Sequence, residues 1–262
     1  MDPVSFMFCI VIYPPYLTYW PLLHHCCSYY LFLLGHIFVS LSGSNVIKLK
    51  HVPRSVADDA LIDPIVRIWG SGVQSSHRKG KDWQIILHGS PWTCKGEMEY
   101  QARRLVVILF QLLGDASYNY VSTVSPEGLS GSPTLIFAAN PSFYPSHFFC
   151  LSFSGSRKKI YIIDAPQLLL DAIVATIRNN FKHSTEPKTV ATNVFEMQLT
   201  TATIQRTDLP HQLANLLHAI GIMGYRLDAN VSLGREGLFG LNGRREIWLF
   251  RSYSPMPGVM YT

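Results

Sequence analysis

The segments HIFVSLSGS at residues 36–44 and FFCLSFSGS at residues 148–156 decide the fold of this chain, because each is a version of the other. In the second version, Phe149, Leu151 and Phe153 alternate with smaller side chains, and this period of two predicts a half-buried β-strand. A turn containing Ser and Gly follows in both versions and predicts that the chain returns as a hairpin. We therefore expect each segment to open a β-rich module.

Further matches follow these two segments in the same order along the chain. Such repeats matter for the fold, because a missed duplication leads to a wrong fold assignment. A single short match is weak support, whereas several in one order indicate a duplication. The matches are Ile47 and Pro53 with Ile160 and Pro166, residues 61–66 with 169–174, residues 118–125 with 225–232, and residues 134–137 with 247–250.

Helical periodicity interrupts the strands within each module. Combined with the alternating segments, it predicts two tandem β-β-α-β-α-β-β modules. Hairpins at both ends of a module make its sheet mainly antiparallel, with the two helices on one face. The expected class is therefore α+β. The second helix of the first module is marked by the apolar positions Ala102, Leu105, Val106, Leu109, Leu112 and Leu113.

The chain divides into four expected parts. They are a hydrophobic N-terminal arm at residues 1–35, modules at 36–139 and 147–252, and a tail at 253–262. Each module has roughly a hundred residues, enough to hold a core of its own. The seam between them is short and contains prolines, so we expect the modules to touch. Two separate sheets and one shared sheet both satisfy the sequence.

Several motifs of the modules stand out beside the repeat. The first module contains IWGSGVQ at residues 68–74, ILHGSPW at 86–92 and ARRL at 102–105, and DAP at 164–166 precedes a helix of the second. Together they resemble a family of uncharacterised repeat proteins common in fungi. The resemblance covers residues 36–252, although the second module lacks the Trp-Gly and Pro-Trp pairs. It implies the tandem repeat and brings no known activity with it.

Composition and charge exclude several classes of protein. With 48% hydrophobic and 15% charged residues, the 262-residue chain is too apolar for intrinsic disorder. Five cysteines are too few for a disulfide scaffold and suit a reducing compartment. The net charge of +5 is spread over both modules rather than clustered as in a nucleic-acid-binding domain. We expect a cytoplasmic protein.

Residues 1–35 are apolar, and Asp2 is their one charged residue. The longer apolar run within them approaches the roughly 20 residues of a membrane-crossing helix. Prolines, histidines and tyrosines weaken a membrane span, and no basic segment precedes the run as in a secretory signal. Three interpretations stay open: a membrane anchor, a hydrophobic arm packed on the body, or a stretch added by an incorrect start site. Membrane association through residues 1–35 is therefore the alternative location.

The loop GLSGSP at residues 128–133 is similar to the nucleophile loop of chymotrypsin-like proteases, with His51 and Asp82 upstream of Ser130. Such a serine needs an adjacent histidine and an oxyanion hole. That fold consists of two β-barrels, whereas a helical pattern lies between Asp82 and Ser130, so a repeat hairpin explains the loop better. Histidines and cysteines show no metal-binding spacing. We predict no catalytic residue, no metal and no cofactor.

Two hairpin ends of the second module are basic. They contain Arg157, Lys158 and Lys159, and Arg244 and Arg245. Positive charge beside aromatic residues suits an anionic ligand or single-stranded nucleic acid, although hairpin ends are often basic for solubility. These five residues are the predicted ligand-binding site.

The sequence as a whole favours a non-enzymatic protein that acts through contacts with a protein partner. Duplication supports this prediction, because two copies of a module supply paired binding surfaces. The alternative is a binder of nucleic acid or another anionic ligand through the basic hairpins of the second module.

Overall fold

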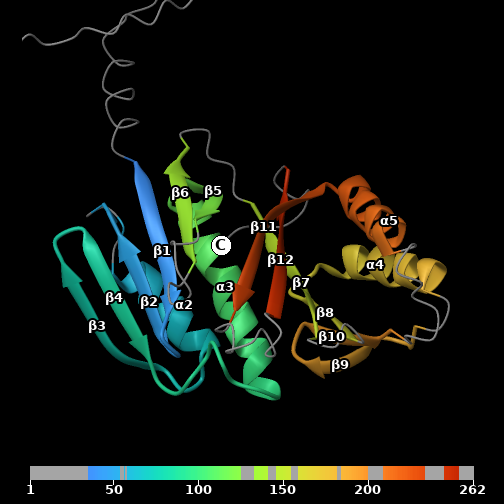
Figure 1. Cartoon of the computed structure of the whole chain (residues 1–262), viewed down its shortest axis with the longest axis horizontal. Coiled ribbons are helices and arrows are strands. Elements are labelled where there is room, and N and C mark those ends of the chain that lie inside the picture. Colours follow the sequence, from blue (N-terminus) through green and yellow to red (C-terminus); the bar gives the residue numbers. More distant parts are fainter. Residues whose placement is uncertain are drawn as a thin grey trace, which may run out of the picture. The chain divides into compact units, whose positions relative to one another are not determined.

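A computed structural model describes residues 35–53, 56, 58–124, 133–140, 146–154, 159–181, 184–199, 209–233 and 245–253. These residues form two halves, each with a six-stranded sheet and two helices (Figure 1). Residues 1–34 of the expected arm and 254–262 of the expected tail lie outside the described residues. Within the described ranges, no helix has the length and apolar character needed to cross a membrane.

The first half contains six strands and two helices. In chain order they are β1 (His36–Ser42), β2 (Val46–Lys50), α2 (Asp58–Ile68), β3 (Val73–Lys79), β4 (Asp82–Leu87), α3 (Glu97–Asp115), β5 (Tyr118–Val124) and β6 (Thr134–Ala139).

The second half repeats this order. Its elements are β7 (Phe148–Phe153), β8 (Lys159–Ile163), α4 (Gln167–Asn180), β9 (Lys188–Ala191), β10 (Val194–Gln198), α5 (Leu209–Ile222), β11 (Tyr225–Leu233) and β12 (Arg245–Ser252).

The two sheets have the same strand order. The first runs β3-β4-β2-β1-β6-β5 and the second runs β9-β10-β8-β7-β12-β11, with antiparallel pairing between neighbours. The predicted α+β class and the two similar halves are confirmed. The sheets are separate, so the alternative of one sheet shared across the seam is excluded.

Each half has one strand more than the sequence predicts. Two strands, not one, lie between the helices, because β3 and β9 pair with β4 and β10. Both added strands are at a sheet edge, and they are polar (VQSSHRK) or short (KTVA). An edge strand can be stable without apolar alternation, which is why the periodicity did not reveal these two.

The segments matched in the sequence occupy equivalent elements. Residues 61–66 and 169–174 lie in α2 and α4, and residues 134–137 and 247–250 lie in β6 and β12. This correspondence is what a duplicated module produces.

Two apolar cores hold the described part of the chain together. The first lies between one face of the first sheet, helices α2 and α3, and one face of the second sheet. The second lies between the opposite face of the second sheet and helices α4 and α5. The second sheet is thus covered on both faces, and every side chain of β7 from Phe148 to Ser152 is buried. The predicted contact between the halves is confirmed.

Helix α3 lies between the two sheets (Figure 1). Its predicted apolar face packs toward the first sheet and α2, while Val107 and Phe110 are also buried. The ring of Phe110 contacts Phe137 of the first sheet and Phe148 of the second, with centroid distances of 4.9 and 6.2 Å. A helix that is apolar around most of its circumference is one that is buried on several sides.

Candidate functional site

The strand ends that flank the predicted basic hairpins adjoin in the fold. Strand β12 pairs with β7, with Ile247 opposite Ser152, and β7 pairs with β8, with Phe153 opposite Ile160. The end of β7 and the beginnings of β8 and β12 therefore lie at one end of the second sheet. The hydroxyl of Ser152 donates to the carbonyl oxygen of Glu246 over 2.9 Å, which fixes this junction.

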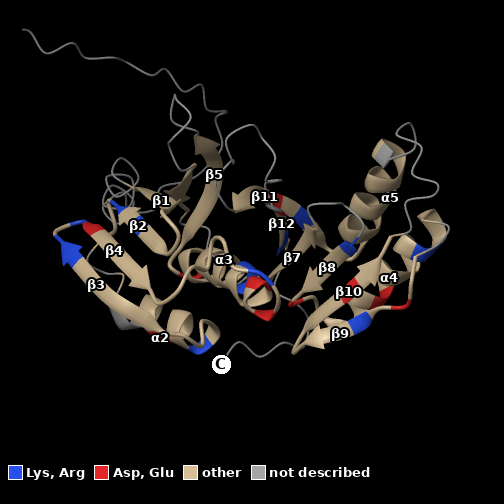
Figure 2. Ribbon diagram, turned by 60° about the horizontal axis from the view of Figure 1, so that its bottom comes forward, with Lys and Arg blue, Asp and Glu red and all other residues tan. Residues whose placement is uncertain are grey.

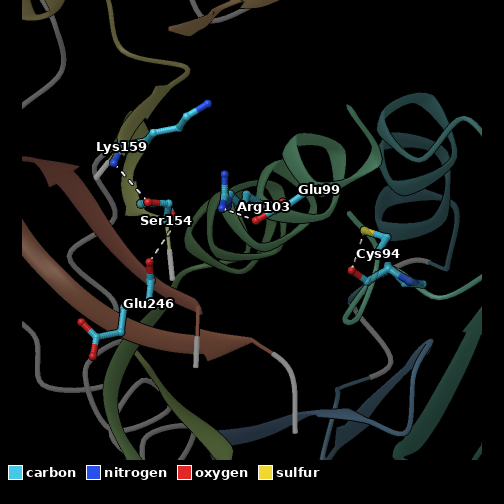
Figure 3. Close-up of polar contacts among 8 residues, drawn as sticks. Cys94, Glu99, Arg103, Ser154, Lys159 and Glu246 are labelled. Carbon is cyan, nitrogen blue, oxygen red and sulfur yellow. Dashed lines mark hydrogen bonds and ion pairs between the residues drawn. The ribbon is translucent and has the colours of Figure 1, made fainter. Parts of the chain in front are cut away.

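Lys159 is the one predicted site residue whose side chain is described. Its ammonium lies 2.8 Å from Glu196 Oε1, and this hydrogen bond raises the pKa of Lys159. Its backbone N–H donates to Ser154 Oγ over 3.1 Å (Figure 3). Arg157, Lys158 and Arg244 lie outside the described residues, as does the side chain of Arg245, whose backbone pairs with Leu233.

The protease-like motif is described only in part. His51 has a φ of 61° and packs edge-on against Phe38, with ring centroids 5.4 Å apart. Ser130 lies outside the described residues. Among the residues that are described, no three His, Cys, Asp or Glu side chains form a metal-binding group.

The motifs ARRL and DAP, sixty residues apart, meet in the fold. Arg104 of α3 donates from Nε and Nη2 to both carboxylate oxygens of Asp164, at 2.9 and 2.6 Å. Asp164 has a φ of 59°, and its backbone N–H donates to the carbonyl of Asn193 in the β9–β10 turn over 2.9 Å. This bidentate pair therefore connects the central helix to the β9–β10 hairpin.

Arg103, the neighbouring residue, is buried in the same interface at 1% exposure. Its Nη2 is 2.5 Å from Glu99 Oε1 (Figure 3). Its guanidinium lies 4.5 Å from the ring centroid of Tyr161 on β8. Within the described part of the chain, its Nε and Nη1 have no hydrogen-bond partner. The aromatic face of Tyr161 compensates part of the cost of burying this charge, and burial raises the pKa of Tyr161.

A hollow of about 610 Å³ lies beside this interface. We call it the α3-side hollow, since the first turns of α3 form one wall and the β9–β10 hairpin forms another. Its rim also includes Arg67 and Ile68 at the end of α2. Figure 2 shows charged residues at the end of α2, on α3 and on β9. The lining residues are Arg67, Ile68, Glu97, Tyr100, Gln101, Arg104, Val190, Ala191, Thr192 and Val194.

A second hollow, of about 330 Å³, lies on the other face of the same hairpin. We call it the α4-side hollow. Leu170 and Val174 of α4 and Phe195 of β10 give it an apolar lining, and Thr189 of β9 borders it. Strand β9 thus has a hollow on each side, and we take this strand with its two hollows as the candidate site.

The comparisons with known proteins address the first half only. One domain-family model matches residues 35–137, which run from the residue before β1 to within β6. No curated protein and no solved structure matches the chain.

Sequence reasoning missed the residues of this candidate site. Arg67, Tyr100 and Lys188 belong to different elements in both halves, so no local spacing connects them. The available signal was the pair of motifs that contain Arg104 and Asp164. The other motifs meet as well, since Trp69 Nε1 donates to the carbonyl of His88 over 2.8 Å. That contact stabilises the first half.

Proposed function

We propose that this chain is a non-enzymatic interaction protein that binds a segment of a protein partner at the candidate site. The observation that carries the proposal is the α3-side hollow, a space of about 610 Å³ to which both halves contribute walls. Aromatic and arginine side chains such as Tyr100 and Arg104 are the types enriched where proteins bind each other. A cytoplasmic location is part of this proposal.

The position of the hollow favours a macromolecular ligand. It lies against the β9–β10 hairpin, and its walls combine apolar Ile68 and Val190 with exposed Arg67. A partner segment can bury the apolar residues while its polar groups meet the charged rim, which is the usual division within a protein interface. Duplication supports this use, because the site is built where the two copies meet.

Site-specific photo-crosslinking tests the proposal in cells that produce the full chain. A benzophenone amino acid replaces Thr192 in the β9–β10 turn, and a matched control replaces Lys81 in the equivalent β3–β4 turn. We expect a crosslinked polypeptide from position 192, identified by mass spectrometry and lost with Arg67→Glu. Equal crosslinking from both positions, or none from position 192, contradicts the proposal.

A second candidate function, binding of single-stranded nucleic acid, is favoured by one observation. Strand β7 pairs with both β8 and β12, so the strand ends that flank the two predicted basic hairpins lie at one end of the second sheet. Fluorescence anisotropy with a labelled oligonucleotide tests it, with Arg157→Glu and Arg244→Glu as variants. The logarithm of the association constant should fall linearly with the logarithm of the salt concentration, because phosphate contacts release counterions. Salt-independent binding, or binding unaffected by either variant, contradicts it.

A further inference from the structure

We propose that the partner segment binds in extended form as an additional strand on the outer edge of β9, with acidic side chains toward the α3-side hollow and apolar side chains toward the α4-side hollow. This inference rests on the proposed interaction function and specifies the chemistry of the partner. It is carried by the main chain of β9, by the two hollows and by the charges around them.

The outer edge of β9 offers main-chain groups for pairing. Strand β9 lies at the end of its sheet, and β10 is the one strand that pairs with it among the described residues. Lys188 and Thr189 are exposed. An edge strand presents a row of N–H and C=O groups that an extended peptide can match, so the complementarity is specific to a polypeptide.

The two hollows match the geometry of an added strand. Successive side chains of a strand point to opposite faces of its sheet. Along β9, Lys188 lies opposite Glu196 and Thr189 lies opposite Phe195, so the two β9 residues face different sides. Ala191 lies opposite Val194 and lines the α3-side hollow, whereas Thr189 borders the α4-side hollow. The register shifts between these two pairs, so Val190 has no residue opposite it, and it lines the α3-side hollow beside Ala191. An added strand therefore directs alternate side chains toward different hollows.

The α4-side hollow selects apolar side chains. Leu170 and Val174 are 4% and 7% exposed, and Phe195 is partly buried against the second core. The polar groups at its rim have partners already. Gln167 donates to Asp171 over 2.8 Å, and Arg178 forms an ion pair with Glu186. A hollow with an apolar lining and a satisfied rim gains most from burial of an apolar side chain.

The α3-side hollow selects acidic side chains. Arg104 is paired with Asp164, and Glu196 is paired with Lys159. Of the charged residues that line this hollow, Arg67 and Glu97 have no ion pair in the described part of the chain. Lys188 does not line the hollow, but it is exposed on β9 opposite Glu196, on the side of the sheet that Val194 faces, and it too has no ion pair among the described residues. Together these three groups amount to one cation in excess.

This excess of positive charge favours a carboxylate placed next to Arg67 or Lys188. The partner segment is therefore an extended peptide in which acidic and apolar residues alternate.

The equivalent strand of the first sheet, β3, provides a matched control. It is also an edge strand, and it has an exposed lysine at its end, Lys79. Its Arg78 donates to the carbonyls of Val56 and Pro53 at 3.0 and 2.9 Å. These bonds hold the connection between β2 and α2 beside β3. Lys79→Glu thus changes an edge charge without touching either hollow.

The test uses a phage-displayed library of random dodecapeptides selected on the full chain. Selected peptides should alternate acidic and apolar residues, and Arg67→Glu should weaken them about tenfold, whereas Lys79→Glu should leave their affinity unchanged. Both substitutions are at exposed positions, so the variants are expected to fold. Hydrogen exchange of the unmodified chain should show protection of residues 188–191 on binding and none of residues 73–79.

N-methylation of a selected peptide distinguishes strand addition from other binding. In a strand added at an edge, only alternate N–H groups of the peptide bond to β9. Methylating that set should abolish binding, and methylating the complementary set should preserve it.

Equal effects of the two sets, unprotected β9 amides, or failure to select any peptide overturn the inference. Peptides that lose affinity with Arg67→Glu but are indifferent to the methylation pattern leave the interaction function standing and refute strand addition alone. Absence of both peptide binding and crosslinking at position 192 refutes the interaction function itself.

Discussion

The guanidinium of Arg104 on the central helix binds both carboxylate oxygens of Asp164 in the other half, with N–O distances of 2.9 and 2.6 Å. The two side chains are 26% and 17% exposed, so solvent screens this pair only in part. It is accompanied at the far end of the interface by Arg251 of β12, which donates from Nη1 to Asn119 of β5 over 2.5 Å. The halves are therefore connected by directional polar contacts as well as by the apolar core.

Loss of the bidentate pair should reduce the free energy of unfolding. We expect Arg104→Lys to cost about 1–2 kcal/mol, because an ammonium cannot reproduce two parallel N–H···O bonds. Urea denaturation measures the change. Asp164→Asn is the second single variant of the pair, since asparagine tolerates the positive φ at this position. A double-mutant cycle with no coupling between the two positions would refute the role assigned to the pair.

Replacement of the buried Arg103 should strongly reduce the free energy of unfolding. Arg103→Ala removes the cation bound to Glu99 and leaves a cavity, and we expect a loss of about 3–5 kcal/mol. The double variant Arg103→Met with Glu99→Gln keeps the volume and removes both charges, so it should recover most of that loss. Chemical denaturation of the three proteins compares them. Equal stability of the single and double variants would mean that the ion pair is unimportant.

Two helical glycines should respond differently to alanine. A Cβ at Gly221 of α5 meets no atom within 4 Å, so Gly221→Ala should stabilise the chain by about 0.5–1 kcal/mol through helix propensity. A Cβ at Gly114 of α3 would lie 3.3 Å from Cε2 of Phe148, so Gly114→Ala should gain less or lose stability. Thermal unfolding followed by circular dichroism measures both. An equal gain at the two positions would show that α3 and β7 are less closely packed than the distance indicates.

Stability should depend on pH through His147 at the seam. Burial lowers the pKa of His147 below its ordinary value of 6.5, and the nearby carboxylate of Asp164 opposes this effect in part. The unfolded chain then binds the proton more tightly than the folded chain, so the contribution is fully present above pH 6.5 and is lost as the pH falls through the folded pKa.

The expected measurement is a set of urea titrations from about pH 7.5 to about pH 5.5, the range in which an ordinary histidine titrates. His147→Gln should flatten the decline at the acidic end. The same slope in the variant would assign the pH dependence to other groups.

The sequence predicted the fold class because its repeat and its periodicities are local signals. Alternation identified β7, and the repeat match of residues 134–137 with 247–250 identified β12. Alternation did not identify β3 and β9, because an edge strand is stabilised mainly by pairing on one side and needs no apolar stripe.

Helix α3 shows a second limit of periodicity. The positions of one apolar face, such as Leu105 and Leu109, were recognised correctly. The apolar side chains of Val107 and Phe110 indicate burial beyond that face. No pattern within the helix, however, predicts that the second sheet supplies this burial. The candidate site shares this limit, since Arg67 and Val190 line one hollow only after both halves have packed around α3.

The burial of α3 from two sides also has a consequence for folding during translation. As the chain leaves the ribosome, β1 to β6 emerge before β7, so the first half can assemble while Val107 and the outer side of Phe110 still face solvent. These apolar side chains remain exposed until the second sheet forms and covers them. The nascent protein therefore passes through a stage that invites chaperone binding or aggregation, and a chain truncated after β6 would remain in that stage permanently.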